Sequence, residues 1–238
     1  MGSTDTTLLG GVPDLGDVPA ATAWLEAKLA FLRALGPSPE IEASFRPVSV
    51  LDLVGAPAPP FGLYGDAAWR RLVLATLLTD WSCYPLPVDQ VGIERLFQVM
   101  FTFPAGFRVW WVEAPGAGWL PVGYTGWFPI AELTFEALAA RPAELRGRNM
   151  PALPTLDPGG SFIYLFNYSV LGPLRGTSCS RRLLRALADD IAAVPLRGLA
   201  AITVSDEGRR VAERFGMRRS GTLVVDGTPE QVYTRRVT

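Results

Sequence analysis

The chain has 238 residues, of which 49% are hydrophobic and 19% are charged, and its formal net charge is −1. This composition is typical of a globular protein with a sizeable core, and the near-neutral charge argues against nucleic-acid binding. The sequence contains no histidine, which excludes Ser-His-Asp and Cys-His catalysis and histidine-ligated metal. Its two cysteines, Cys83 and Cys179, are too few for a disulfide framework, and we expect no metal site.

No signal for export or for a membrane span is present. No basic segment followed by an apolar run precedes Pro13, so we expect no signal peptide and a cytoplasmic location. No uncharged apolar stretch reaches the ~20 residues of a membrane span. Residues 1–16 are polar and glycine-rich, and we expect them to be loose.

The N-terminal half alternates between helical and extended patterns. A helix is predicted from Asp17 to Leu35, and Pro37-Ser38-Pro39 breaks it. Further elements are predicted as follows: a strand at 46–54, a rigid connector at 56–60, helices at 65–81 and 88–100, strands at 107–113 and 119–128, a helix at 131–140, and a proline-rich irregular segment at 141–160.

The C-terminal half contains a strand, a turn and a helix in succession: 162–170, 175–180 and 181–193. A second strand at 199–204 and a short helix follow. Asp226-Gly227 is a strong hairpin signal and joins the last two predicted strands, 220–225 and 231–236. The order of elements predicts a mixed α/β protein.

The strand–turn–helix succession is also typical of an anion site. The first N–H groups of a helix point out of its end, and the helix dipole adds partial positive charge there. Arg175 stands at the entrance to this helix. We therefore expect the turn to bind a phosphate group.

The run from Val170 to Leu184 resembles the GNAT superfamily of N-acetyltransferases, whose signature is a strand and then Arg/Gln-x-x-Gly-x-Gly/Ala opening a helix. Arg175, Gly176 and Leu183-Leu184 lie close to that register, and Phe215-Gly216-Met217 is similar to the family's aromatic-Gly exit. The resemblance implies an α/β fold with a GNAT-like mixed, mostly antiparallel sheet flanked by helices and an extra N-terminal helix. It also implies two parts: an N-terminal extension at 1–39 and an acyltransferase domain at 40–238.

The resemblance implies acetyl-CoA or another acyl-CoA as the donor, with an acyl carrier protein thioester as an alternative. In the family, backbone N–H groups of a splayed strand hold the acyl carbonyl, and here these belong to Val170 and Leu171. The cofactor-binding residues implied are Val170, Leu171, Arg175, Gly176, Thr177, Ser178, Cys179, Ser180 and Arg181.

The departures from the family's pattern concern the same site. The two loop glycines are Ser178 and Ser180, and the tyrosine that protonates the leaving thiolate is replaced by Ala212. Ser205 stands where the second landmark has asparagine. The hydroxyl-bearing candidates for catalysis are Tyr168, Tyr164 and Ser205, although paired strand tyrosines are more often core residues.

Three functions are compatible with these residues. The first is an N-acyltransferase, in which a small-molecule or peptide amine attacks the thioester directly. The second is a binding or scaffolding protein that kept the fold and lost turnover. The third is a partner-binding protein that uses the N-terminal helix. The sequence leaves an acyl carrier protein partner and a homodimer open.

Overall fold

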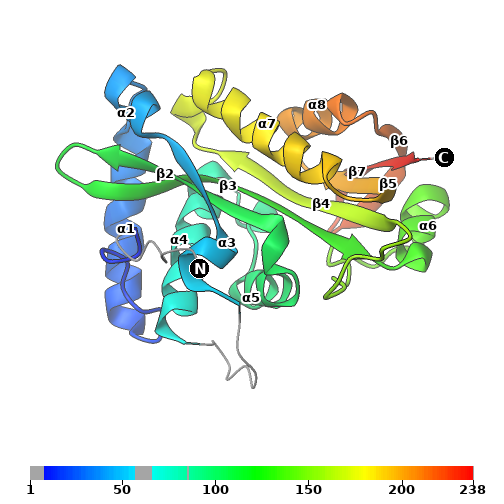
Figure 1. Ribbon diagram of the computed structural model, residues 1–238, viewed down its shortest axis with the longest axis horizontal. Coiled ribbons are helices and arrows are strands. Elements are labelled where there is room, and N and C mark those ends of the chain that lie inside the picture. Colours follow the sequence, from blue (N-terminus) through cyan, green and yellow to red (C-terminus); the bar gives the residue numbers. More distant parts are fainter. Residues whose placement is uncertain (1–7, 57–65, 85, 238) are drawn as a thin grey trace. The chain divides into compact units, whose positions relative to one another are not determined.

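The computed structural model describes residues 8–56, 66–84 and 86–237 (Figure 1). Within these residues, seven strands are hydrogen-bonded neighbours in the order β1-β2-β3-β4-β5-β7-β6. The β1–β2, β5–β7 and β6–β7 pairs are antiparallel and β4–β5 is parallel. This mixed, mostly antiparallel sheet flanked by helices confirms the predicted fold class. The predicted connector at 56–60 lies, apart from Ala56, outside the described residues.

The chain divides into two compact units, one of residues 1–125 with 169–184 and one of residues 126–168 with 185–238. Strands β3 and β4 and helix α7 contribute residues to both units. The first unit contains α1 (Val18–Ala34), α2 (Pro39–Ser44), β1 (Arg46–Ser49), α3 (Val50–Val54), α4 (Ala67–Cys83), η1 (Pro87–Asp89), α5 (Ile93–Thr102), η2 (Pro104–Gly106), β2 (Phe107–Ala114), residues 118–125 of β3 (Gly118–Ile130), the end of β4 (Ser161–Val170), η4 (Gly172–Leu174) and the first turns of α7 (Ser178–Ala192). The second unit contains the rest of β3, β4 and α7 with α6 (Glu132–Ala140), η3 (Pro142–Glu144), β5 (Leu196–Thr203), α8 (Asp206–Arg214), β6 (Arg218–Val225) and β7 (Thr228–Arg236).

The N-terminal helix α1 confirms the predicted helix and packs against α4. Asp17 caps it by accepting a hydrogen bond from the Ala20 N–H at 3.2 Å. The expectation that residues 1–16 are loose is wrong for the described part, because Leu8, Leu9 and Val12 are buried. These three buried apolar side chains anchor the segment in the core.

The predicted strand at 46–54 is wrong in its second half. Ser49 ends β1 and starts α3: its Oγ accepts from the Asp52 N–H at 3.1 Å and donates to the Asp52 carboxylate at 2.7 Å. Gly55, with φ of +72°, ends that helix in a conformation that favours glycine. Helix α2 was not predicted; it begins after Ser38, whose Oγ accepts from the Ile41 N–H at 3.2 Å.

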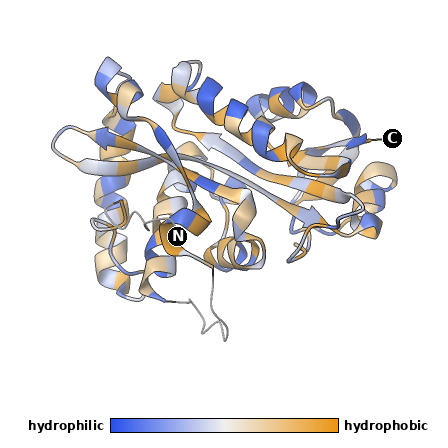
Figure 2. Cartoon of the chain, viewed as in Figure 1, coloured by the Kyte–Doolittle hydropathy of each residue, from blue (hydrophilic) through white to orange (hydrophobic). Residues whose placement is uncertain are grey.

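The second unit is a sheet edge covered by α6 and α8. The predicted hairpin between β6 and β7 is confirmed, with φ of +48° at Asp226 and +80° at Gly227. A Cβ at Gly198 in β5 would lie 2.9 Å from the Phe135 ring of α6, so glycine permits this close packing. Helix α8 is mostly hydrophilic (Figure 2), and Ala212 is its buried residue.

Candidate functional site

The predicted anion-binding turn lies in the first unit, between the end of β4 and the start of α7. Helix α7 begins at Ser178, earlier than the predicted start at Arg181, so Ser178 and Cys179 belong to its first turn. Thr177 precedes the helix. Its Oγ1 accepts from the Cys179 N–H at 3.2 Å and donates to the Leu174 carbonyl at 2.7 Å. Thr177 therefore caps α7 and satisfies one of the helix's N-terminal donors.

Arg175 and Gly176 form the exposed part of this turn. Gly176 has φ of +75°, and a Cβ built there would meet no atom within 4 Å, so glycine serves the backbone conformation. The Arg175 Nε donates to the Val170 carbonyl at 3.3 Å and its Nη2 to the Cys83 carbonyl at 3.4 Å. The guanidinium therefore bridges the end of β4 and the end of α4 through two long hydrogen bonds.

The other side chains of the turn also have partners within the chain. The Ser178 Oγ donates to the Oε2 of Glu42, a carboxylate on α2. The Ser180 Oγ donates to the Thr177 carbonyl at 3.1 Å. The Arg181 Nη1 donates to the carbonyl of the turn glycine at 3.3 Å. The polar side chains assigned to cofactor binding are thus held in place before any ligand binds.

The two backbone N–H groups assigned to the acyl carbonyl have different surroundings. The Leu171 N–H donates to the Val122 carbonyl of β3 at 2.8 Å, so this donor already has a partner within the sheet. Val170 precedes it, and neighbouring residues of an extended strand direct their N–H groups to opposite sides. Strand β3 comes very close at this point, since a Cβ at Gly123 would lie 2.8 Å from the Ser169 carbonyl oxygen. Val170 is therefore the remaining candidate.

A buried polar cluster around Asp80 lies in the same unit. The Tyr124 hydroxyl donates to the Asp80 Oδ1 at 2.7 Å, and the Val91 N–H donates to its Oδ2 at 2.8 Å. Both Asp80 and Tyr124 are fully buried. Burial and the neighbouring Asp80 charge hold the pKa of Tyr124 well above its usual range. Sequence reasoning missed this cluster; the available signal was an acid two residues after the largely apolar run 72–78 of a helix.

The two cysteines are buried thiols. Burial raises the pKa of Cys83 to about 12, although the Arg175 charge acts in the opposite direction. Burial also raises the pKa of Cys179. Both thiols are therefore protonated at neutral pH, and neither has the thiolate character that a nucleophile needs.

The three predicted catalytic hydroxyls belong to the second unit and have unlike environments. Tyr164 is buried, with its ring 5.4 Å from that of Phe128. Ser205 caps α8, and its Oγ accepts from the Gly208 N–H at 3.1 Å. Tyr168 is half-buried. The environments assign Tyr164 to the core and Ser205 to a helix cap, which leaves Tyr168 as the catalytic candidate.

Strands β4 and β5 pair over only part of their length. The parallel register runs from Ser161↔Leu196 to Leu165↔Ala201, while β4 continues to Val170. This early end of the pairing agrees with the splayed strand that the GNAT resemblance implies.

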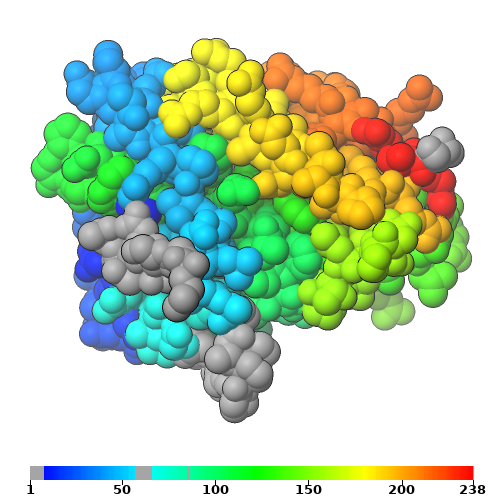
Figure 3. All heavy atoms as spheres, viewed as in Figure 1, coloured from blue at the N-terminus to red at the C-terminus, as the bar shows by residue number. Residues whose placement is uncertain are grey.

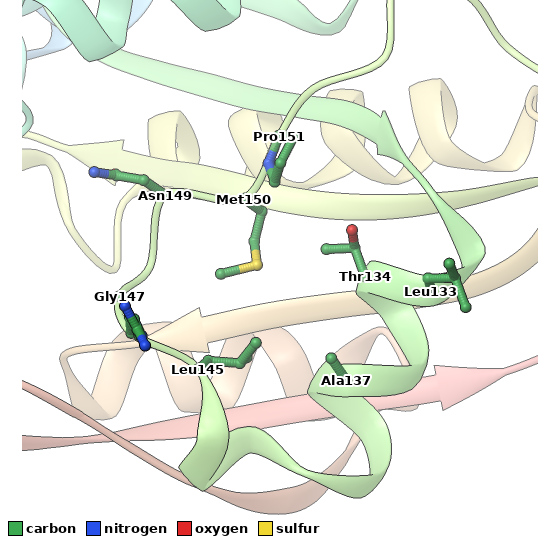
Figure 4. A pocket seen from close by; sticks show the side chains of 9 residues that line it. Leu133, Thr134, Ala137, Leu145, Gly147, Asn149, Met150 and Pro151 are labelled. Atoms are coloured by element: carbon green, nitrogen blue, oxygen red, sulfur yellow. The ribbon is translucent and has the colours of Figure 1, made fainter.

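The second unit also holds a pocket of about 540 Å³ between α6 and the proline-rich segment (Figure 4). Its lining is largely apolar, and the Met150 and Leu145 side chains point toward each other. The lining residues are Leu133, Thr134, Ala137, Leu145, Arg146, Gly147, Asn149, Met150 and Pro151. Met150 and Pro142 of this segment are buried, so the segment at 141–160 has a buried inner side in addition to the surface position expected from its sequence.

Comparison with known proteins identifies the fold. No protein-family model matches the chain, and no curated protein matches its sequence. Among solved structures, the loading GNATL domain of CurA from Lyngbya majuscula aligns with a TM-score of 0.51 and 13% identity, over 81% of this chain and 96% of that one. The GphF GNAT-like decarboxylase in complex with isobutyryl-CoA aligns at 0.50 and 16%, over 81% and 98%. A chain of the NatC complex bound to Gag peptide and CoA aligns at 0.51 and 10%, over 82% and 99%.

The chain therefore has the GNAT fold, as its turn and helix motif implied. Over the part of the chain that the structure describes, no helix is both long and apolar enough to cross a membrane. Within the same residues, no group of three or more cysteine or acidic side chains is arranged to hold a metal ion.

Proposed function

We propose that this chain transfers an acyl group from a CoA thioester to an amine. The observation that carries the proposal is the GNAT fold combined with the glycine turn that opens the fifteen-residue helix α7. The N–H groups at such a helix start attract an anion, and phosphate is the anion that CoA presents there. Strand β4 also continues beyond the residues that pair with β5, and this unpaired end supports acyl transfer as well.

The residues of the turn fit a phosphate in two respects. The surface at Gly176 is open, and both Arg175, its neighbour in the chain, and Arg181, which donates to the Gly176 carbonyl, are exposed cations. One feature opposes a phosphate, because the Glu42 carboxylate already accepts the Ser178 hydroxyl. We assign phosphate binding to the backbone N–H groups at the start of α7 and to Arg175, whose two hydrogen bonds are long enough to be exchanged at low cost.

In the proposed reaction the amine nitrogen bonds to the acyl carbon and loses a proton, while the carbon–sulfur bond breaks and the sulfur takes a proton, so that the products are an amide and a free thiol. The Val170 N–H donates to the oxygen that becomes negative in the transition state. Ala212 cannot supply the proton, and Tyr164 and Ser205 are committed to the core and to a cap. We therefore propose Tyr168 as the general acid.

The test is a calorimetric titration with acetyl-CoA, followed by a thiol-release assay with small-molecule and peptide amines. We expect Tyr168→Phe to lower kcat while the affinity for acetyl-CoA is unchanged. Tyr233→Phe is the matched control, because the Tyr233 hydroxyl donates to Gln231 at 3.1 Å and has no assigned role in the reaction. Absence of acetyl-CoA binding by the wild-type protein would refute the proposal.

A scaffolding protein that binds the coenzyme without turnover is the second candidate. The internal hydrogen bonds of Ser178 and Ser180 and the loss of the family's tyrosine at Ala212 favour it. Binding of acetyl-CoA without thiol release from any amine would support this candidate. An acyl carrier protein donor, a homodimer and a cytoplasmic location stay predictions; native mass spectrometry tests the first two.

A further inference from the structure

Helix α2 holds a carboxylate in a fixed position. Its C-terminal neighbour Phe45 is buried and stacks on Trp110 with ring centroids 4.8 Å apart. The Ser44 Oγ accepts from the Glu113 N–H of β2 at 2.9 Å. Both contacts anchor the helix to β2, so Glu42, which lies between the two ends of α2, has a well-defined direction.

Glu42 points to the start of α7. Its carboxylate accepts the Ser178 hydroxyl, and its backbone carbonyl accepts from the Arg182 Nη1 at 3.3 Å. The same guanidinium lies 5.3 Å from the centre of the Phe45 ring. Figure 3 shows the light-blue atoms of α2 directly against the yellow atoms of the first turns of α7. The chain therefore places one of its own anions at the helix end to which phosphate binding is assigned.

We propose that Glu42 sets the selectivity of this turn among thioester donors. It weakens the binding of donors that carry a diphosphate, such as CoA, relative to pantetheine thioesters that carry no phosphate. The inference rests on the proposed function, because it concerns the same turn.

Two physical effects give Glu42 this role. A carboxylate at a helix N-terminus uses the partial positive charge that would otherwise stabilise a phosphate. A diphosphate placed beside it also meets a like charge at short range, in a part of the protein that water screens only in part. Burial and the Glu42 charge both raise the pKa of Cys179, which agrees with a carboxylate acting on this helix end.

The experiment compares Glu42→Gln with wild type by calorimetric titration with CoA and with pantetheine. Glutamine keeps the shape of the side chain and its hydrogen bond to Ser178, so the fold is retained, and a thermal melt checks this. Glu40→Gln is the matched control, because Glu40 carries the same charge on the same helix and is exposed. We expect Glu42→Gln to bind CoA about tenfold more tightly at low salt, with less gain at high salt.

The remaining titrations decide the outcome. We expect pantetheine to bind wild type and Glu42→Gln equally, and Glu40→Gln to bind CoA as wild type does. Equal CoA affinity of wild type and Glu42→Gln would overturn the inference and leave the proposed function intact. An equal gain for pantetheine would overturn it as well, since the effect would then be independent of phosphate. Absence of CoA binding by all three proteins would refute the proposed function together with the inference.

Discussion

Removing the Tyr124 hydroxyl tests the buried cluster around Asp80. In Tyr124→Phe the aromatic packing is kept, and the Asp80 carboxylate loses a donor that lies 2.7 Å from its Oδ1. A buried charged group that loses such a hydrogen bond costs about 1.5–3 kcal/mol of unfolding free energy. In a chain of this size each kcal/mol corresponds to about 2–4 °C, so the melting temperature falls by roughly 3–12 °C.

The assay is denaturant and thermal unfolding at pH 7, with Tyr233→Phe as the reference. The Tyr233 hydroxyl donates to a neutral amide at 3.1 Å, so its removal costs less, about 0.5–1.5 kcal/mol. A loss in Tyr124→Phe no larger than the loss in Tyr233→Phe would refute the reasoning, because the hydrogen bond to Asp80 would then contribute no more than one to a neutral amide.

Three further predictions concern the N-terminal segment, the turn and a helix cap. Hydrogen bonds from Arg70 lower the pKa of Asp14 from 3.8 to about 2, so this contact stabilises the fold above pH 3.8 and is lost as the pH falls toward 2. Asp14→Asn is therefore less stable than wild type at pH 6. Unfolding curves are expected to show that the difference in unfolding free energy between the two proteins shrinks as the pH falls to 2, and a difference that does not change with pH would contradict this. Arg175→Ala weakens CoA binding about tenfold and Arg185→Ala does not, as measured by calorimetry; equal effects would mean that the turn does not hold the coenzyme. Ser205→Ala lowers the unfolding free energy by about 1 kcal/mol and Ser205→Asp restores it, whereas equal stability of the two variants would exclude the capping role.

The elements that could be predicted from the sequence carry their signals locally. Asp17 caps the helix that it precedes, and Asp226-Gly227 occupies the left-handed region that its hairpin requires. In each case a few neighbouring residues determine the backbone, so tertiary contacts are not needed to recognise the element. The division at residue 39 depends on such contacts and stays a prediction.

Other features depend on residues far apart in the chain. Tyr124 and Asp80 are 44 positions apart, and Glu42 and Ser178 are 136 positions apart. No local sequence pattern therefore predicts either hydrogen bond. The error at 46–54 has a different origin. The capping signal at Ser49 was readable, but the alternation of apolar residues that continues past it favoured a longer strand.

The departures from the GNAT pattern at the turn and the helix before β1 belong to one arrangement. A glycine at 178 would offer no hydroxyl to Glu42, and the carboxylate would then lie at the helix end without its side-chain donor. Conversely, without Glu42 the Ser178 hydroxyl would be directed at whatever anion the turn binds. The hydrogen bond to Glu42 of α2 therefore explains why residue 178 is a serine, although α2 is far from this position in the sequence. A change at one position is expected to alter the effect of a change at the other, because the two side chains share a single hydrogen bond.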